Sequence, residues 1–333
     1  MKFLVINLKK YFFTIIFSIF IILLFILSEP ILNATKLGLE LWAFKILPSL
    51  FPFFVATELL LKTNITSILG RTFNKFMKPI FNVPGESSIA LILGNISGYP
   101  IGAKVVCNLK KCKQISPVEA ERLIAYTNNS SPFFILTTVG FSMFYDKKIG
   151  QILLFSHIVS SILVGICFKY WKKNYNSIDV SAFSKNKNST QLISSSNLGE
   201  VLNDSIRNAT FSILSVGGFI ILFSIILEML NSTGIISVLS QVANLFNIPP
   251  DVSKCILTSF IEITNGINLI SSLNSFNLNF KLLITSFALG FGGISILLQV
   301  YSIISKENIS IKPYFYGKLL QGLFSFIITY ILI

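Results

Sequence analysis

The segment GNISGYPIGAK, at residues 94–104, places polar and flexible residues inside an otherwise apolar stretch. Its glycines let the chain bend and approach a ligand closely, and its proline suits the first turn of a new half-helix. The N–H groups freed at such a break can hold a carboxylate. We predict a binding tip, with ordinary kinked packing as the alternative, formed by Asn95, Ser97, Gly98, Tyr99 and Lys104. The lysine either adds a cation or simply anchors the segment.

A second polar break, TNNSSP, occupies residues 127–132. It offers hydrogen-bond donors and acceptors in succession, from Asn128, Asn129, Ser130 and Ser131, before a proline starts the next half-helix. Polar groups inside an apolar region are costly and usually functional. We predict that they bind a ligand, with a structural network between helices as the alternative. The stretch Gly290–Gly293 takes the corresponding position later in the chain, and it offers bare backbone, with Gly292 and Gly293 as its predicted binding residues.

A third break carries an acidic residue, Glu262, followed by Thr264 and Asn265. A carboxylate at this position could bind a cation, carry a proton or pair with a base such as Lys104. It would repel an anionic ligand unless it were protonated or paired. Purely structural pairing is the alternative. His157, the single histidine, could likewise carry a proton, or it could simply pack between helices through a hydrogen bond.

Other reactive residue types give no recognisable pattern. The four cysteines (Cys107, Cys112, Cys167 and Cys255) form no CxxC pair, and one histidine excludes a His-based metal cluster. The chain has no HExxH or GxSxG motif and no paired aspartates in its apolar segments. We expect no catalytic residue, no metal and no cofactor, hence no enzyme.

The composition indicates a helical membrane protein. The chain has 333 residues, of which 53% are hydrophobic and 12% charged, and its mean hydropathy is +0.73. Phe alone contributes 32 residues, far more than a water-facing surface tolerates. The apolar runs are long and continuous rather than alternating, which argues against a membrane barrel. We expect an all-α polytopic protein whose main partner is the lipid bilayer.

The net charge of +13 does not indicate nucleic acid, because the basic residues lie in short loops between apolar runs. Such loops obey the positive-inside rule of membrane proteins. We predict that residues 1–36 contain an apolar first span rather than a cleaved signal. Residues 169–199, rich in Ser, Asn and Lys, form a hydrophilic linker between two halves, 37–168 and 200–333.

The two halves resemble each other. Corresponding positions are 165, 160 and 167 residues apart, in the pairs Phe81/Phe246, Glu121/Lys281 and Gly150/Gly317. If the broken segments enter and leave on the same side, the proposed inside regions hold 20 Lys and Arg, including those of Lys306–Lys318, and the outside regions hold 5. The second half is then inverted relative to the first, with a cytoplasmic N-terminus. Inverted repeats with broken helices are a transporter plan, in which Glu262, Thr264 and Asn265 are coupling candidates.

The motifs LWAFKILPSLFPFF, GNISGYPIGAK, EAERLIAYTNNSSPFFI, EITNGI and GFGGIS together resemble the YlbJ-type sporulation integral membrane proteins, also called stage V sporulation protein SpoVV. The resemblance runs from about Leu37 to the C-terminus. That family belongs to the group with the nucleoside-recognition Gate domain and is similar to concentrative nucleoside transporters. The two halves would then be Gate-like repeats.

The resemblance implies transport of dipicolinic acid across the outer forespore membrane, out of the mother cell, by alternating access. Composition and periodicity could not supply this cargo, a small organic anion. A nucleoside or nucleobase transporter and a non-transporting assembly factor of the spore envelope are the alternatives. The coupling ion (H⁺ or Na⁺) and a homo-oligomeric state stay open.

Overall fold

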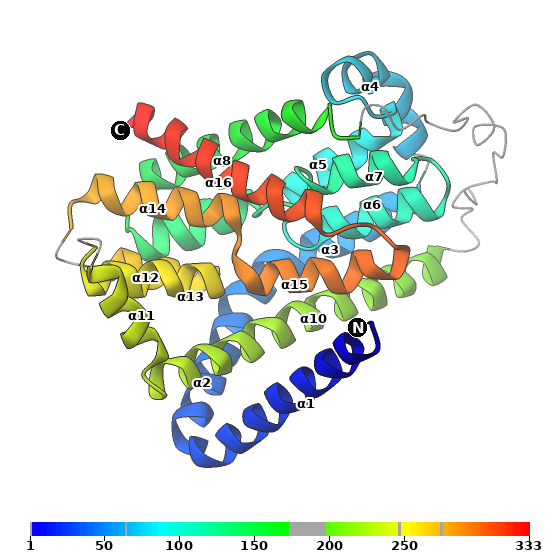
Figure 1. Ribbon diagram of the computed structural model, residues 1–333. Coiled ribbons are helices and arrows are strands. Elements are labelled where there is room, and N and C mark those ends of the chain that lie inside the picture. Colours follow the sequence, from blue (N-terminus) through cyan, green and yellow to red (C-terminus); the bar gives the residue numbers. More distant parts are fainter. Residues whose placement is uncertain (1, 64, 173–197, 246–247, 274–275) are drawn as a thin grey trace.

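The computed structural model describes residues 2–63, 65–172, 198–245, 248–273 and 276–333. These residues form helices joined by short connections, with no strand among them (Figure 1). Five helical stretches are long and apolar enough to cross a bilayer: Ser28–Leu61, Lys147–Phe168, Leu198–Ser232, Leu278–Glu307 and Lys312–Leu332. About 20 apolar residues suffice for one crossing. The predicted all-α polytopic membrane fold is confirmed.

The first long stretch is built from three consecutive helices, α2 (Ser28–Glu40), the π-helix η1 (Leu41–Ile46) and α3 (Leu47–Leu61). Proline in the first turn of α3 removes a backbone donor, and the neighbouring π-turn accommodates the bend. Helix α1 (Lys2–Ile26) precedes them and ends at a bend at Leu27. Helix α2 therefore runs across the predicted boundary between residues 36 and 37.

A short amphipathic helix follows in each half. In the first half, a basic stretch between two apolar runs forms α4 (Ile65–Phe81), which buries Met77 and exposes Arg71 and Lys75. In the second half, α11 (Ile235–Asn244) occupies the equivalent place in the element order. One polar and one apolar face suit a helix that lies in the membrane interface. Phe246, the counterpart of Phe81, lies outside the described residues.

The first broken segment folds back on itself. The 3-10 turn η2 (Gly85–Ser87) leads into α5 (Ser88–Ile96), and α6 (Ile101–Lys111) begins after a turn of four residues. A Cβ built on Gly94 would lie 3.1 Å from the Cα of Gly102. A continuous helix would separate these residues by about 12 Å. The segment is therefore a helical hairpin, as a re-entrant segment requires.

The second broken segment has the same shape. Helix α12 (Pro250–Ile261) ends at Glu262, and α13 (Ile263–Ser272) turns back along it. A Cβ built on Gly266 would lie 2.3 Å from the Cα of Ser259, although seven positions separate them. Both predicted interruptions are thus tips of helical hairpins.

Two further helices are broken without folding back. In the first half, α7 (Pro117–Ile124) stops and residues 125–131 run irregularly before the π-helix η3 (Phe134–Met143). In the second half, α14 (Leu278–Phe291) stops at Gly292, which has φ +85°, and α15 (Gly293–Ile304) follows in a new direction before the 3-10 turn η5 (Ser305–Glu307) (Figure 1). The interruption in this half is narrower than the predicted Gly290–Gly293.

One helix closes each half, α8 (Lys147–Phe168) and α16 (Lys312–Leu332). They pack against each other and run in opposite directions (Figure 1). The Ser156 hydroxyl lies 2.9 Å from that of Thr329, far along α16. An antiparallel pair is what two inverted halves require. Helix α10 (Leu198–Ser232) opens the second half and packs along α2 and α3. Residues 173–197 of the predicted linker lie outside the described residues.

Candidate functional site

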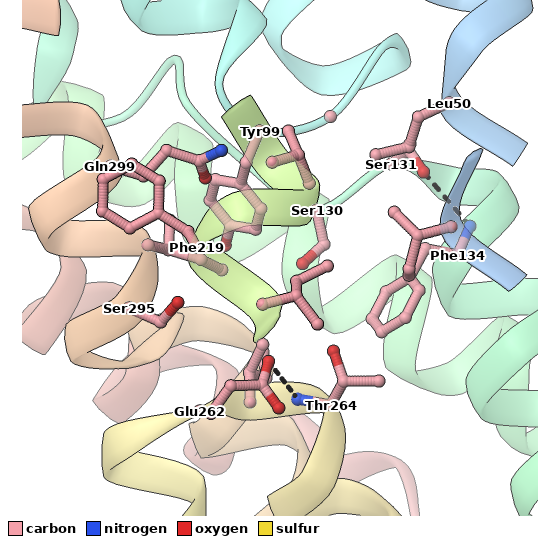
Figure 2. Close-up of a pocket in the computed structure, with 16 residues that line it drawn as sticks. Leu50, Tyr99, Ser130, Ser131, Phe134, Phe219, Glu262, Thr264, Ser295 and Gln299 are labelled. Atoms are coloured by element: carbon pink, nitrogen blue, oxygen red, sulfur yellow. Dashed lines mark hydrogen bonds between the residues drawn. The ribbon is translucent and has the colours of Figure 1, made fainter. Parts of the chain in front are cut away.

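Three of the four interruptions border one cavity of about 60 Å³, through Gly98 and Tyr99, Ser130 and Ser131, and Glu262 and Thr264 (Figure 2). Helix α15, which follows the fourth interruption, contributes Ser295 and Gln299. Apolar side chains complete the wall: Ile46, Leu50, Phe134, Val216, Phe219, Ile220, Ile263 and Ile296. A mostly apolar cavity with a few convergent polar groups is the usual form of a small-molecule site.

Two lining groups have no hydrogen-bond partner among the described residues. They are the Ser130 hydroxyl and the Gln299 amide nitrogen, each on a side chain that is 3% exposed. A buried polar atom left unpaired costs about 1–3 kcal/mol. Both groups can donate a hydrogen bond, so the cavity offers two free donors to a ligand. Sequence reasoning had singled out Ser130 but missed Gln299.

Glu262 caps α13 with both of its carboxylate oxygens. Oε1 accepts from the Thr264 N–H at 3.1 Å and Oε2 accepts from the Asn265 N–H at 2.7 Å. The side chain is 2% exposed and lies at the lower end of the cavity in Figure 2. The helix N-terminus stabilises the negative charge. Glu262 is the one residue of acidic or basic type in the lining.

Lys104 lies elsewhere. Its Nζ atom is 2.8 Å from Oε1 of Glu58 on α3 and 2.7 Å from the hydroxyl of Ser212 on α10. It belongs neither to the cavity lining nor to the partners of Glu262. The predicted pairing of Lys104 with Glu262 is therefore wrong, and Lys104 joins the first hairpin to the two long helices beside it.

The tip of the first hairpin reaches the cavity through Gly98 and Tyr99. Gly98 has φ +84°, a conformation that side-chain-bearing residues rarely adopt. A Cβ there would also lie 3.0 Å from the Cβ of Ser131. Tyr99 donates its hydroxyl to the Leu289 carbonyl at 3.4 Å. The first hairpin tip is thus joined to α14 of the second half.

Asn128 has a structural role in the described conformation. Its Oδ1 accepts from the Ala103 N–H at 3.2 Å, and its Nδ2 donates to the Tyr314 hydroxyl at 3.3 Å. The preceding carbonyl, of Thr127, lies in a notch where a Cβ on Gly94 would come within 1.6 Å of it. Asn128 holds the broken helix across the hairpin and does not line the cavity.

Asn129 is the centre of a buried polar network behind the cavity. Its Oδ1 accepts from Lys318 Nζ at 2.8 Å and from Gln321 Nε2 at 2.9 Å. Its Nδ2 donates to Asn95 Oδ1 at 2.9 Å and to the Tyr126 carbonyl at 2.8 Å. Of the predicted binding residues, Asn95 and Asn129 therefore meet each other rather than the cavity.

Sequence reasoning misplaced Lys318. Its side chain is 1% exposed and lies within the last spanning helix, whereas the charge pattern assigned it to an inside loop with Lys306 and Lys312. Helix α16 begins at residue 312, so Lys318 stands almost two turns inside the helix, which the charge pattern of the sequence does not indicate. An ionisable residue at that depth is expected to be functional.

The remaining predicted residues surround the cavity or support it. The Ser97 hydroxyl is 2.7 Å from that of Thr57, and Asn265 donates to the Ser224 hydroxyl at 3.3 Å. Gly292 and Gly293 do not line the cavity, although a Cβ on Gly292 would lie 3.2 Å from the Tyr99 hydroxyl. Gly292 thus permits close packing of the two halves, and Gly293 permits close packing against the end of α12, where a Cβ would lie 3.1 Å from the Ser259 carbonyl oxygen.

His157 supports the second break from behind. Its Nε2 accepts from the Ser130 N–H at 3.2 Å, so the neutral ring carries its proton on Nδ1. Nδ1 has no hydrogen-bond partner among the described residues. Of the two roles considered for His157, the hydrogen-bonded packing role is present in this conformation.

The helices, the spans and the breaks define an integral membrane protein of the all-α class. A family model described as Gate, nucleoside recognition, matches residues 43–147. The sporulation integral membrane protein YlbJ of Bacillus subtilis (strain 168) is 35% identical over 314 residues, covering 90% of this chain and 77% of that protein. The chain belongs to the family of this sporulation membrane protein, as its motifs predicted. No solved structure matches the chain.

Proposed function

We propose that this protein transports a small organic anion, dipicolinic acid, across the outer forespore membrane by alternating access. The observation that carries the proposal is that three helix interruptions, and the helix that follows the fourth, border one cavity with unpaired donors. Substrates of secondary transporters bind where helices are broken near the middle of the membrane. The family membership supports a role in sporulation, and the residue patterns favour a transporter over an enzyme.

The donors suit a carboxylate. The Ser130 hydroxyl and the Gln299 amide have hydrogen bonds to give, and carboxylate oxygens accept several. Tyr99 and Phe134 present aromatic rings to the same cavity, against which a planar heteroaromatic ring can pack (Figure 2). A pyridine ring with carboxylates combines both features.

The cavity of about 60 Å³ is smaller than the roughly 150 Å³ of an engineered protein cavity that binds benzene. We infer that the cavity must widen before it can hold dipicolinate. The two hairpins are the elements whose tips border the cavity, so their movement would open it to one side at a time.

Glu262 is the proposed coupling residue. Its carboxylate faces the cavity and would repel a dianion, so uptake of a proton or binding of Na⁺ by Glu262 would make the substrate acceptable. Substrate and coupling ion would then share one cavity. We further propose a cytoplasmic N-terminus and inverted halves, from the distribution of lysine and arginine.

The test is flux of labelled dipicolinate into proteoliposomes that contain the purified full-length chain, with and without a proton or sodium gradient. We expect gradient-dependent uptake by the wild type, a strong loss of uptake in Ser130→Ala, and uptake that no longer depends on the gradient in Glu262→Gln. Asn203→Ala, on the exposed face of α10, is the matched control and should transport normally. If both cavity variants took up dipicolinate as the wild type does, the proposed site would be refuted. If dipicolinate entered no vesicle, including those with the wild type, the proposed cargo would be refuted.

A nucleoside or nucleobase is the second candidate cargo, because the matching family model is described as nucleoside recognition. The two are separated by competition: unlabelled uridine or adenine would reduce dipicolinate uptake only if it shared the cavity. A non-transporting assembly factor of the spore envelope predicts no flux of either compound and no effect of Ser130→Ala on sporulation.

A further inference from the structure

Lys318 carries a buried ammonium group without an acidic partner. Its side chain is 1% exposed. The ion pairs of the described residues join other lysines, namely Lys62, Lys104 and Lys172, to acidic groups. A buried charge normally has a counter-charge, because desolvation costs several kcal/mol per ion.

The groups around the ammonium are neutral. Nζ donates to Asn129 Oδ1 and to Gln321 Oε1, both at 2.8 Å. It lies 5.4 Å from the ring centroid of Tyr99 and 5.7 Å from that of Tyr314, close enough for cation–π attraction. These contacts hold the amino group in place but provide no counter-charge, so a positive charge on Lys318 becomes favourable when an anion enters the neighbouring cavity.

The charge is close to the cavity. Tyr99 lines the cavity and also carries Lys318 near its ring. Asn129, which accepts a hydrogen bond from Lys318, directly precedes Ser130, whose free hydroxyl lines the cavity. In the low-dielectric interior of the protein, a charge on Lys318 would act on a ligand in the cavity without touching it.

The only charged residue type in the cavity lining, Glu262, does not cancel this field. Both of its oxygens are held by backbone N–H groups at the start of α13, whose helix dipole partly offsets the negative charge. Glu262 lies on the hairpin of the second half, whereas Lys318 lies behind Tyr99 and Ser130 of the first. A positive charge on Lys318 would therefore act on the Tyr99–Ser130 side of the cavity, away from Glu262.

We propose that Lys318 determines the charge selectivity of this site, drawing a substrate carboxylate to the Tyr99–Ser130 side of the cavity. The proposal rests on the proposed function in that the cavity is taken as the substrate site. It applies to organic carboxylates as a class, whichever of them is the natural cargo. Asn129 and Gln321 are positioning residues that hold the ammonium behind the cavity wall.

The test compares a dianion with a neutral ligand of similar shape. Binding of dipicolinate and of pyridine-2,6-dicarboxamide to the purified full-length chain in detergent is measured by calorimetry. Lys318→Gln should weaken dipicolinate binding by roughly tenfold or more, the size of a screened charge interaction, and leave the diamide unchanged. Lys254→Gln, an exposed lysine of α12, is the control and should change neither. Equal loss of both ligands, or no loss of either, would overturn the proposal.

A second variant guards against misfolding of Lys318→Gln. Gln321→Glu keeps the lysine and places a carboxylate where Oε1 now lies 2.8 Å from Nζ, so a charge on Lys318 is neutralised. The variant loses the Nε2 donation to Asn129 Oδ1 and to the His157 carbonyl, so its unfolding midpoint is measured beside the binding. It should also weaken dipicolinate selectively. A Gln321→Glu protein that retains the wild-type preference for the dianion would contradict the proposal.

Acetate, benzoate and picolinate extend the panel and separate this inference from the identity of the cargo. If the wild type transports no dipicolinate but binds another carboxylate in a Lys318-dependent way, the cargo is wrong and the inference holds. If dipicolinate is transported and bound equally by wild type and Lys318→Gln, the cargo holds and the inference fails. Binding of no carboxylate by the wild type refutes the inference as well.

Discussion

Lys318 Nζ lies 2.8 Å from Asn129 Oδ1, although 189 residues separate them in the chain. The bond joins the broken helix of the first half to the closing helix of the second. Both groups are buried, so water cannot replace either partner. The two halves consequently share one polar centre, and any movement between them must carry this pair along or break it.

Asn129→Ala should destabilise the protein strongly. The substitution removes the acceptor of Lys318 and Gln321 and the donor to Asn95, leaving a buried ammonium with one neutral partner. We expect the free energy of unfolding to fall by about 3 kcal/mol, the usual cost of disrupting a buried charged network. Denaturant titration of the detergent-solubilised protein measures the change.

The control for this loss is Asn203→Ala, since Asn203 lies on the exposed face of α10. Its free energy of unfolding should stay within about 0.5 kcal/mol of the wild type. An Asn129→Ala protein as stable as this control would show that the network contributes nothing to the fold.

Gly102→Ala should disrupt the contact between the first hairpin and the irregular stretch that follows α7. A Cβ at Gly102 would lie 2.2 Å from the carbonyl oxygen of Thr127, a backbone atom that cannot rotate away. We expect a loss of about 3 kcal/mol, because overpacking that moves backbone reaches this size. The unfolding midpoint of the purified variant checks it.

Gly218→Ala is the matched control. Nothing lies within 4 Å of a Cβ at Gly218, and the residue stands inside the helix α10. Alanine there should add roughly 0.5–1 kcal/mol of stability through its higher helix propensity. If Gly102→Ala and Gly218→Ala were equally stable, the close approach of Gly102 to the Thr127 carbonyl oxygen would be contradicted.

The broken segments could be predicted from sequence because glycine, proline and clustered amides are rare within apolar runs. GNISGYPIGAK and TNNSSP are visible without any structure, and the positions predicted from them, Ser130 and Tyr99, line the cavity. Which members of each cluster face the cavity could not be predicted. Asn128 turns toward Ala103 and Tyr314, and that choice depends on packing between segments far apart in the chain.

Residues without a local signal were missed. Gln299 stands in the uninterrupted helix α15, and Lys318 in an apolar run whose first turns contain other lysines. Composition cannot distinguish a lysine at the end of a helix from one whose side chain faces the interior of the helix bundle. The rotation of the helix about its axis determines which way the side chain points. Only the Asn129 and Tyr99 contacts of Lys318 reveal its position.

Glu262→Gln should uncouple transport from pH and weaken the cap of α13. A glutamine side chain has one acceptor oxygen, so either the Thr264 or the Asn265 N–H loses its partner, at a cost of about 1 kcal/mol. If Glu262 must be neutral to admit a dianion, wild-type uptake rises as the pH on the substrate side falls. The glutamine variant, neutral at every pH, should show a flat profile in proteoliposomes.

Glu200→Gln serves as the control for the pH profile, because Glu200 is exposed at the start of α10. It should follow the wild type at each pH. A Glu262→Gln profile as steep as the wild-type one would assign the coupling to another group.

The inverted halves predict opposite sides for Lys147 and Lys306. Both are exposed, and each lies at or just before the start of a closing helix, α8 or α16. The cysteines at 107, 112, 167 and 255 are first replaced by alanine or serine, and single cysteines are introduced as Lys147→Cys or Lys306→Cys. Because α8 and α16 run antiparallel, we expect a membrane-impermeant maleimide added to intact cells to label residue 147 alone.

Asn203→Cys, which the charge distribution also places inside, should become reactive together with residue 306 after the cells are opened. Labelling of 147 and 306 from the same side would exclude the inversion, since two antiparallel spanning helices cannot begin on one side of a membrane.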